Sequence, residues 1–226
     1  MTTPRRRHVT GESTRALLME TAERLFAAKG VEAVTIKEIQ QEAGQSNASV
    51  TVYHFGSKTG LVRALIQWRS GRLDKRRDTL LEQTRAEGHV DPRAVVWLLV
   101  RPLVESIRDG EMFVPFLARL SEDPRANTEY WPTDVADWTQ EEMQDLVGGA
   151  LGDMPERLRR GRTVQLYNSV LNLLGEQARS GHRISELQLH NYVDAWVGMI
   201  TAPVSAETQA LLEPREPAPD DGTATA

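Results

Sequence analysis

The side chains best suited to chemistry in this sequence lie in one short polar stretch, residues 45–51. Gln45, Asn47, Ser49 and Thr51 carry amide and hydroxyl groups there. An Asn or Gln amide can bond an adenine edge through two hydrogen bonds, and a Thr methyl group can pack on a thymine methyl group. We therefore expect this stretch to read DNA bases.

Patterns for catalysis or metal binding are not found in the sequence. The chain has no cysteine, so disulfides and thiolate chemistry are excluded. None of the five histidines has a partner at zinc-ligand spacing. Gly-rich phosphate loops and the G-x-S-x-G motif are missing too. We expect neither an enzyme nor a bound cofactor or metal.

Helix signals surround the polar stretch. Thr35 and Glu38 have the S/T-x-x-E spacing of a capping box, which predicts a helix start. Gly44 ends that helix, and a second helix is predicted over about residues 46–54. A helix, a glycine turn and a polar helix form a helix-turn-helix, whose second helix enters the DNA major groove.

This segment resembles the DNA-binding domain of the TetR family of bacterial regulators. The resemblance is carried by TRALLMETAERLFAAKG, VEAVTIKEIQQEAG and YHFGSKTGLVRAL, and it covers nearly a quarter of the chain, from about Thr14 to Leu65. From Gly44 to Phe55 the chain has one residue more than the commonest family pattern.

The resemblance implies that Thr35, Tyr53, His54 and Lys58 touch the DNA backbone. For Tyr53 and His54 the alternative is packing of their rings against the first helix. Val50 and Val52 are expected to pack between helices, and Phe55 to lie in the core. The full set of residues expected to contact DNA is Thr35, Lys37, Gln45, Ser46, Asn47, Ser49, Thr51, Tyr53, His54 and Lys58.

Charge is distributed unevenly along the chain. Residues 1–90 carry 15 Lys and Arg against 10 Asp and Glu, a balance of +5, whereas residues 91–226 carry 12 against 22, a balance of −10. A basic first part suits a DNA-binding domain, although charge asymmetry alone is also compatible with an accident of surface composition. The basic residues near the start either lie along phosphates or enter a minor groove, or they form a solvated tail; they are Arg5, Arg6, Arg7 and His8.

Helix patterns without strand patterns predict an all-α fold with two domains. We expect a disordered basic arm over 1–12, a three-helix DNA-binding domain over 13–57, a helical ligand-binding and dimerisation domain over 58–212, and a disordered tail over 213–226. The chain has neither a signal peptide nor a run of about 20 apolar residues that could span a membrane, so we expect a cytoplasmic protein without membrane contact.

Two features of the second domain bear on function. A helix of nearly 30 residues should start at about Lys58, with Arg69, Arg72, Lys75, Arg76 and Arg77 on a solvated face. The helices over 161–178 and 185–202 are apolar on more than one face, which predicts a four-helix homodimer interface. The alternative is a fully internal helix pair.

The resemblance further implies a homodimer on an inverted-repeat operator, with a repressor as the favoured form, and a small-molecule effector. Aromatic residues suggest an apolar pocket, although aromatic residues at helical spacing are more often core. Arg101 either meets a ligand anion or pairs with an acidic neighbour such as Glu105. The expected ligand-binding residues are Trp97, Arg101, Phe113, Phe116, Trp131, Trp138 and Tyr167. The alternative functions are a DNA-binding regulator whose second domain is only a dimerisation scaffold, and a helical enzyme.

Overall fold

The computed structural model describes residues 5–212, apart from 48, 87, 89, 124 and 133–142. Every element in these ranges is a helix, which confirms the all-α prediction. The helices are α1 (Arg5–Lys29), α2 (Ile36–Glu42), α3 (Val50–Phe55), α4 (Lys58–Ala86), α5 (Pro92–Arg108), α6 (Phe113–Leu120), α7 (Ala126–Glu129), α8 (Met143–Leu151), α9 (Glu156–Arg179), α10 (Glu186–Thr201) and α11 (Ala206–Ala210).

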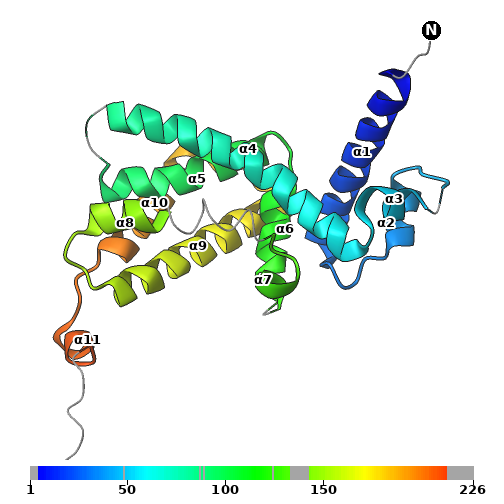
Figure 1. Ribbon diagram of the computed structural model, residues 1–226. Coiled ribbons are helices and arrows are strands. Elements are labelled where there is room, and N and C mark those ends of the chain that lie inside the picture. Colours follow the sequence, from blue (N-terminus) through cyan, green and yellow to red (C-terminus); the bar gives the residue numbers. More distant parts are fainter. Residues whose placement is uncertain are drawn as a thin grey trace, which may run out of the picture.

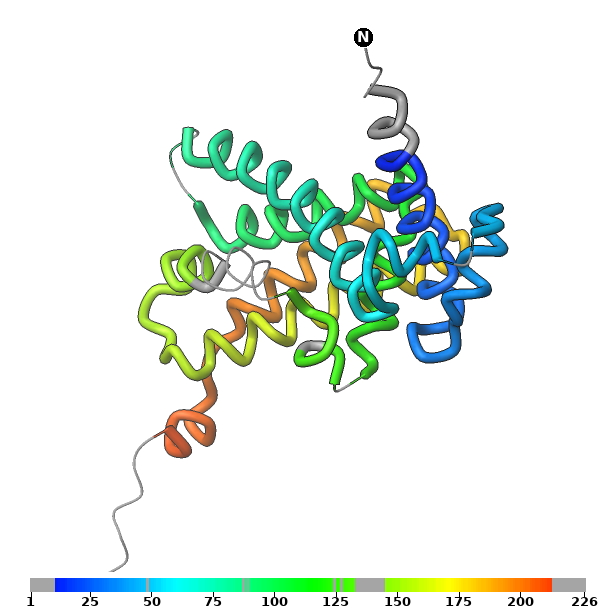
Figure 2. The backbone as a smooth tube through the Cα atoms, turned by 45° about the vertical axis from the view of Figure 1, so that its right-hand side comes forward, coloured from blue at the N-terminus to red at the C-terminus, as the bar shows by residue number. Residues whose placement is uncertain are grey.

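The molecule has a head, α1–α3 with the first turns of α4, and a body, α5–α10 with the rest of α4. The head lies at one end, and α4 runs from it across the body (Figure 1). The turned view of Figure 2 shows the same order, with α11 projecting from the opposite end. Among the described helices, none is both long and apolar enough to cross a membrane.

The first helix begins earlier than predicted. Since α1 starts at Arg5, residues 5–12 are helical, and the expected disordered arm is wrong for them. Residues 1–4 and the predicted tail over 213–226 lie outside the described residues.

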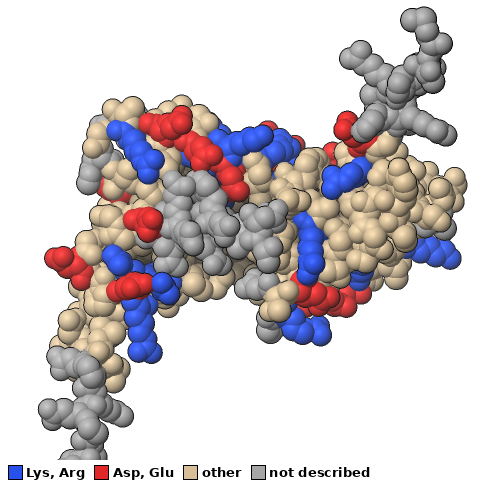
Figure 3. Space-filling model, in the orientation of Figure 1, with Lys and Arg blue, Asp and Glu red and all other residues tan. Residues whose placement is uncertain are grey.

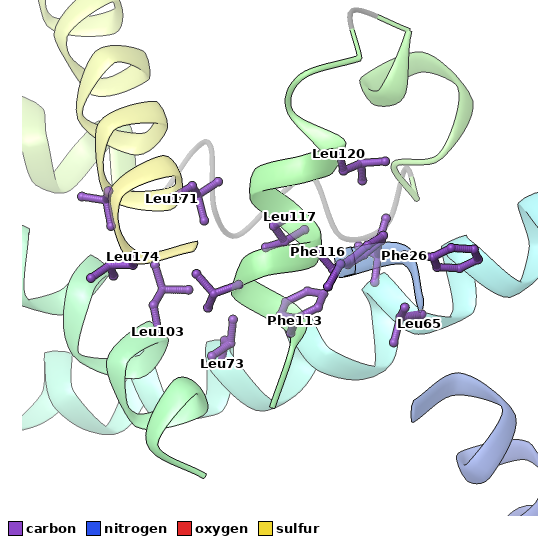
Figure 4. Packing of buried hydrophobic residues seen from close by; sticks show 14 of the residues in the cluster. Phe26, Leu65, Leu73, Leu103, Phe113, Phe116, Leu117, Leu120, Leu171 and Leu174 are labelled. Carbon is purple, nitrogen blue, oxygen red and sulfur yellow. The ribbon is translucent and has the colours of Figure 1, made fainter. Parts of the chain in front are cut away.

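Head and body share one apolar core. Phe26 of α1 and Leu65 of α4 meet Phe113 and Phe116 of α6, and all four are fully buried (Figure 4). The ring centroids of Phe26 and Phe116 are 6.0 Å apart, as are those of Phe113 and Phe116. Each buried aromatic ring removes a large apolar area from water. The head is therefore held to the body by packing as well as by the continuity of α4.

The arginines of α4 do not form the expected solvated face. Arg69 and Arg77 are buried, and Arg77 donates to Asp74 at 2.8 Å. Arg76 donates to both oxygens of Glu105 in α5, at 2.7 and 2.9 Å. Those hydrogen bonds hold the pKa of the Glu105 carboxyl below its ordinary value. Only Arg72 and Lys75 of this set are exposed, so most of these charges fasten α4 to other helices or to itself.

The outward sides of α9 and α10 are mixed rather than wholly apolar. Their large side chains mostly face the core, as for Leu166, Leu174 and Trp196. Val164 and Leu187 are exposed. The alternative of a fully internal helix pair is therefore excluded, because each helix presents a side to solvent.

The crossing of α6 and α9 is unusually close. A Cβ atom at Gly175 of α9 would lie 2.6 Å from the Cβ atom of Ala118 in α6. Real Cβ atoms do not approach a side-chain carbon so closely, so the glycine sets the distance between the two helices.

Replacing this glycine tests the crossing. Gly175→Ala should lower the free energy of unfolding by about 1–3 kcal/mol, because the added methyl group overpacks the contact. Gly71→Ala is the control: Gly71 is an exposed position of α4 with open space around it. There alanine should stabilise the helix by up to about 1 kcal/mol. Urea unfolding of the two variants measures both effects, and equal stability of Gly175→Ala and wild type would contradict the close crossing.

Candidate nucleic-acid interface

The first helix of the predicted pair begins as expected. Thr35 has extended backbone angles, and its hydroxyl oxygen accepts a hydrogen bond from the Glu38 amide at 3.1 Å. The Glu38 carboxylate accepts from Lys29 Nζ at 2.6 Å, so it ties α2 to the end of α1. Thr35 and Lys37 are both exposed at this edge of the head.

The second helix starts later than predicted. It begins at Val50 instead of residue 46, so Gln45, Ser46 and Asn47 lie in the preceding turn rather than on the helix. The Asn47 side-chain oxygen accepts from the Ser49 amide at 3.0 Å, which stabilises this turn. Gln45 donates to the Ala43 carbonyl at 3.3 Å. Ser46, Asn47 and Ser49 are exposed, and they remain available to a ligand.

Two residues of α3 have exchanged the predicted roles. Thr51, expected to read a base, is only 1% exposed, and its hydroxyl accepts from Gln40 Nε2 of α2 at 3.0 Å. Val52, expected to pack between helices, is 60% exposed. The prediction fails because α3 turns Thr51 toward α2 and Val52 outward. Thr51 is therefore a packing residue, and Val52 joins the exposed surface.

The ring residues at the end of α3 differ in exposure. Tyr53 is 84% exposed, so it does not pack against α1, and the alternative for this residue is wrong. His54 is half-buried, with its ring 5.0 Å from that of Tyr53 and 5.9 Å from that of Phe55. Phe55 is half-buried rather than fully in the core, and Arg15 lies over its ring at 5.2 Å.

Gly60 fixes the position of α3, and sequence reasoning missed it. A Cβ atom at Gly60 would lie 2.0 Å from the carbonyl oxygen of Phe55. Only glycine lets the end of α3 approach the first turn of α4 so closely. The Ser57 hydroxyl caps this turn by accepting from the Gly60 amide at 3.0 Å, and Lys58 Nζ donates to the Glu32 carbonyl at 3.4 Å.

The resulting surface suits recognition rather than catalysis. In the view of Figure 3 the surface over α2 and α3 is mostly uncharged, with basic side chains at its edge. Amide, hydroxyl, phenol and valine groups share this edge of the head. Within the described ranges, no three His, Asp or Glu side chains are grouped so that they could hold a metal ion.

Residues 18–65 match the family model described as bacterial regulatory proteins, tetR family. The amino-terminal domain belongs to the TetR family. The HTH-type transcriptional regulator TtgR of Pseudomonas putida is 34% identical over 88 residues, which are 39% of this chain and 40% of that protein. The match to this curated relative thus spans about two fifths of its length.

Comparison with solved structures shows that the fold of the body is also similar to that of known proteins. A γ-butyrolactone receptor (ArpA-like protein) superposes with a TM-score of 0.54 at 19% identity, covering 84% of this chain and 97% of that one. The TetR-family regulator PfmR from Thermus thermophilus gives 0.52 at 18% identity, covering 91% and 99%. The TetR-type arrangement of helices therefore includes most of this chain.

The residues predicted to bind a ligand come from several elements of the body. Phe113 and Phe116 are core residues at the junction of head and body, as the alternative of plain core aromatics expects. Trp131 and Tyr167 are half-buried against the core. Trp138 lies outside the described residues.

Arg101 is also placed differently from the prediction. It is exposed on α5, with its guanidinium 5.0 Å from the centre of the Trp97 ring. His190 of α10 also lies next to Trp97, and the centroids of the two rings are 5.1 Å apart. Glu105, the predicted acidic partner, instead accepts the paired hydrogen bonds of Arg76. Arg101 thus covers an aromatic ring at the surface rather than facing a cavity.

Removing the Thr51 hydroxyl tests its assignment as a packing residue. Thr51→Val should lower the free energy of unfolding by about 1–3 kcal/mol, because a buried hydrogen bond to Gln40 is lost. It should leave the preferred DNA sequence unchanged. Ser49→Ala is the control, since Ser49 is exposed and its side chain makes no cap hydrogen bond; its stability should change by less than about 0.5 kcal/mol. A changed base preference in Thr51→Val would restore Thr51 to the reading residues.

Proposed function

We propose that the chain is a transcriptional regulator that binds an inverted-repeat operator as a homodimer. A repressor released by a small molecule is the favoured form. The observation that carries this proposal is the exposed edge formed by α2, the turn and α3 on a TetR-family domain. The role places the protein in the cytoplasm, where bacterial DNA lies.

The reading surface has two kinds of side chain. Ser46, Asn47, Ser49 and Val52 are small or apolar exposed groups that fit the major groove, where amides bond base edges and methyl groups contact thymine. We assign the residues around them to contacts with the phosphate backbone. These residues are Thr35, Lys37, Tyr53, His54 and Lys58. Gln45 is half-buried and hydrogen-bonded within the turn, so we assign it to stabilising this surface.

Apolar groups on the outward sides of α9 and α10 support the proposed dimerisation through these helices. Val164 and Leu187 are exposed there, and Val197 and Met199 are half-buried. A second copy of the same pair would cover these apolar groups in a four-helix interface with two-fold symmetry. Two heads related by a two-fold axis read two half-sites of opposite orientation, which is an inverted repeat.

Control by a small molecule is the remaining part of the proposal. Trp97, Trp131 and Tyr167 offer half-buried rings in the body, so we propose an apolar or aromatic effector. An effector acts only through a difference in affinity between the DNA-bound and free conformations.

The decisive experiment is selection of bound sequences from random duplex DNA at two salt concentrations. We expect an enriched inverted repeat, together with a dimer in sedimentation. If the folded protein enriches no sequence, the proposed role as a transcriptional regulator is overturned. Small apolar and aromatic compounds are then screened for release of the operator; if none acts, the body is a dimerisation scaffold.

Lys37 tests the phosphate contacts. Lys37→Ala should weaken binding to all sequences alike, and the slope of log affinity against log salt should fall by about one unit, because one phosphate contact is lost. Lys75→Ala is the matched control, since Lys75 is an exposed lysine of α4 beyond the head. A loss confined to the preferred operator would mean that Lys37 reads a base.

Val52 tests base reading by an apolar contact. Val52→Ala should cost about 1 kcal/mol of operator affinity, because two methyl groups leave a contact with a thymine methyl group. Replacing that thymine with deoxyuridine should cost wild type a similar amount and cost the variant nothing further. If each thymine replacement affects wild type and variant equally, Val52 contacts no thymine.

A further inference from the structure

A buried cluster of charges lies where the head meets the body. Arg69 of α4 is 6% exposed and Glu23 of α1 is 2% exposed. The guanidinium donates from Nε to Glu23 Oε2 at 2.6 Å and from Nη2 to Glu23 Oε1 at 3.2 Å. This two-pronged contact joins the first helix of the head to α4.

The same guanidinium also reaches the body. Arg69 Nη1 donates to Glu111 Oε1 at 2.5 Å, in the short connection between α5 and α6. Glu111 accepts further hydrogen bonds from Arg72 Nη1 and the Ser106 hydroxyl, both at 2.6 Å. Two carboxylates thus face two guanidinium groups, and the charges balance.

Glu23 makes a direct bond to the body as well. Its Oε1 atom accepts from the backbone amide of Met112, immediately before α6, at 2.8 Å. Burial raises the pKa of the Glu23 carboxyl, and the hydrogen bonds from Arg69 oppose that rise. One carboxylate of α1 therefore holds both α4 and the start of α6 in fixed directions.

These directional hydrogen bonds fix the orientation of α1 relative to α6, which the neighbouring apolar contacts cannot do. Phenylalanine rings such as Phe26 and Phe116 stay in contact after a small slide or rotation of α1 against α6. A guanidinium that is bonded to the buried carboxylate of Glu23 and the half-buried carboxylate of Glu111 keeps all of its hydrogen bonds in one arrangement only. A displacement would leave buried charges unpaired, which is strongly unfavourable.

We propose that Glu23, Arg69 and Glu111 are positioning residues that fix the angle of the DNA-reading head on the body, and thereby the operator spacing that the dimer accepts. This inference rests on the proposed function. It assigns the cluster no contact with DNA, so the sequence of each half-site is left to α3 and its turn.

Two substitutions separate geometry from charge. Glu23→Gln keeps the shape of the side chain and removes its charge. Arg69→Lys keeps the positive charge and loses the planar fork that joins two carboxylates. The control is Glu105→Gln, which breaks the Arg76 pair between α4 and α5, where no residue of the head takes part.

The measurement uses duplexes in which the two selected half-sites are separated by spacers of different length. For both cluster variants we expect the affinity ratio between the best and the neighbouring spacers to fall at least about fivefold, the size of a typical coupling between sites. Half-site sequence preference should stay that of wild type, and Glu105→Gln should keep the wild-type spacing profile. Folded variants with an unchanged profile would show that the cluster contributes to stability alone.

A second measurement needs no DNA. The chain has no cysteine, so spin labels can be attached at Gln41→Cys in α2 of the head and Asp145→Cys in α8 of the body, both exposed positions. With labelled protein diluted into unlabelled protein, the distance distribution should broaden in the two cluster variants and not in Glu105→Gln. An unchanged distribution would overturn the inference, whereas a wild-type protein that selects no operator would overturn only the proposed function.

Discussion

The packing of α6 between α1 and α9 is the contact on which the rest of the molecule depends. On one side α6 places Phe113 and Phe116 against the head, and on the other it lies against Gly175 of α9. Protein interiors are packed as closely as crystals and pass displacement on rather than absorbing it. A short helix in the middle of such a core therefore connects the proposed dimer helices to the DNA-reading domain without an intervening loop.

The capping signal at Thr35 predicted the start of α2 correctly, whereas the starts of α1 and α3 were predicted wrongly. Thr35, Asp91 and Ser185 each cap a helix by accepting a hydrogen bond from an amide three residues on. Such caps depend on neighbouring residues only, so they can be read without knowing the fold. The order of the helices in the head follows from the Thr35 cap, from the glycine turn and from the family motifs.

Positions that depend on packing between helices were predicted less well. Because α3 has only six residues, its periodicity is too short to show which side faces α2, and Thr51 and Val52 were interchanged. The buried charges are easier to recognise in the sequence. Glu23 interrupts the apolar stripe of Met19, Ala22 and Phe26, and the arginines at 69, 72, 76 and 77 follow helical spacing. This pattern marks a charged helix face, but most of its acidic partners, Glu23, Glu105 and Glu111, lie outside α4, so only the fold identifies them.

Gly60 has a mechanical consequence for the reading helix. Because the last carbonyl of α3 lies against the first turn of α4, the two helices cannot turn independently of each other. α3 lies at one end of the long helix α4. A rotation of α4 within the body would therefore carry Val52 and Tyr53 with it, so the proposed reading surface follows any movement of α4.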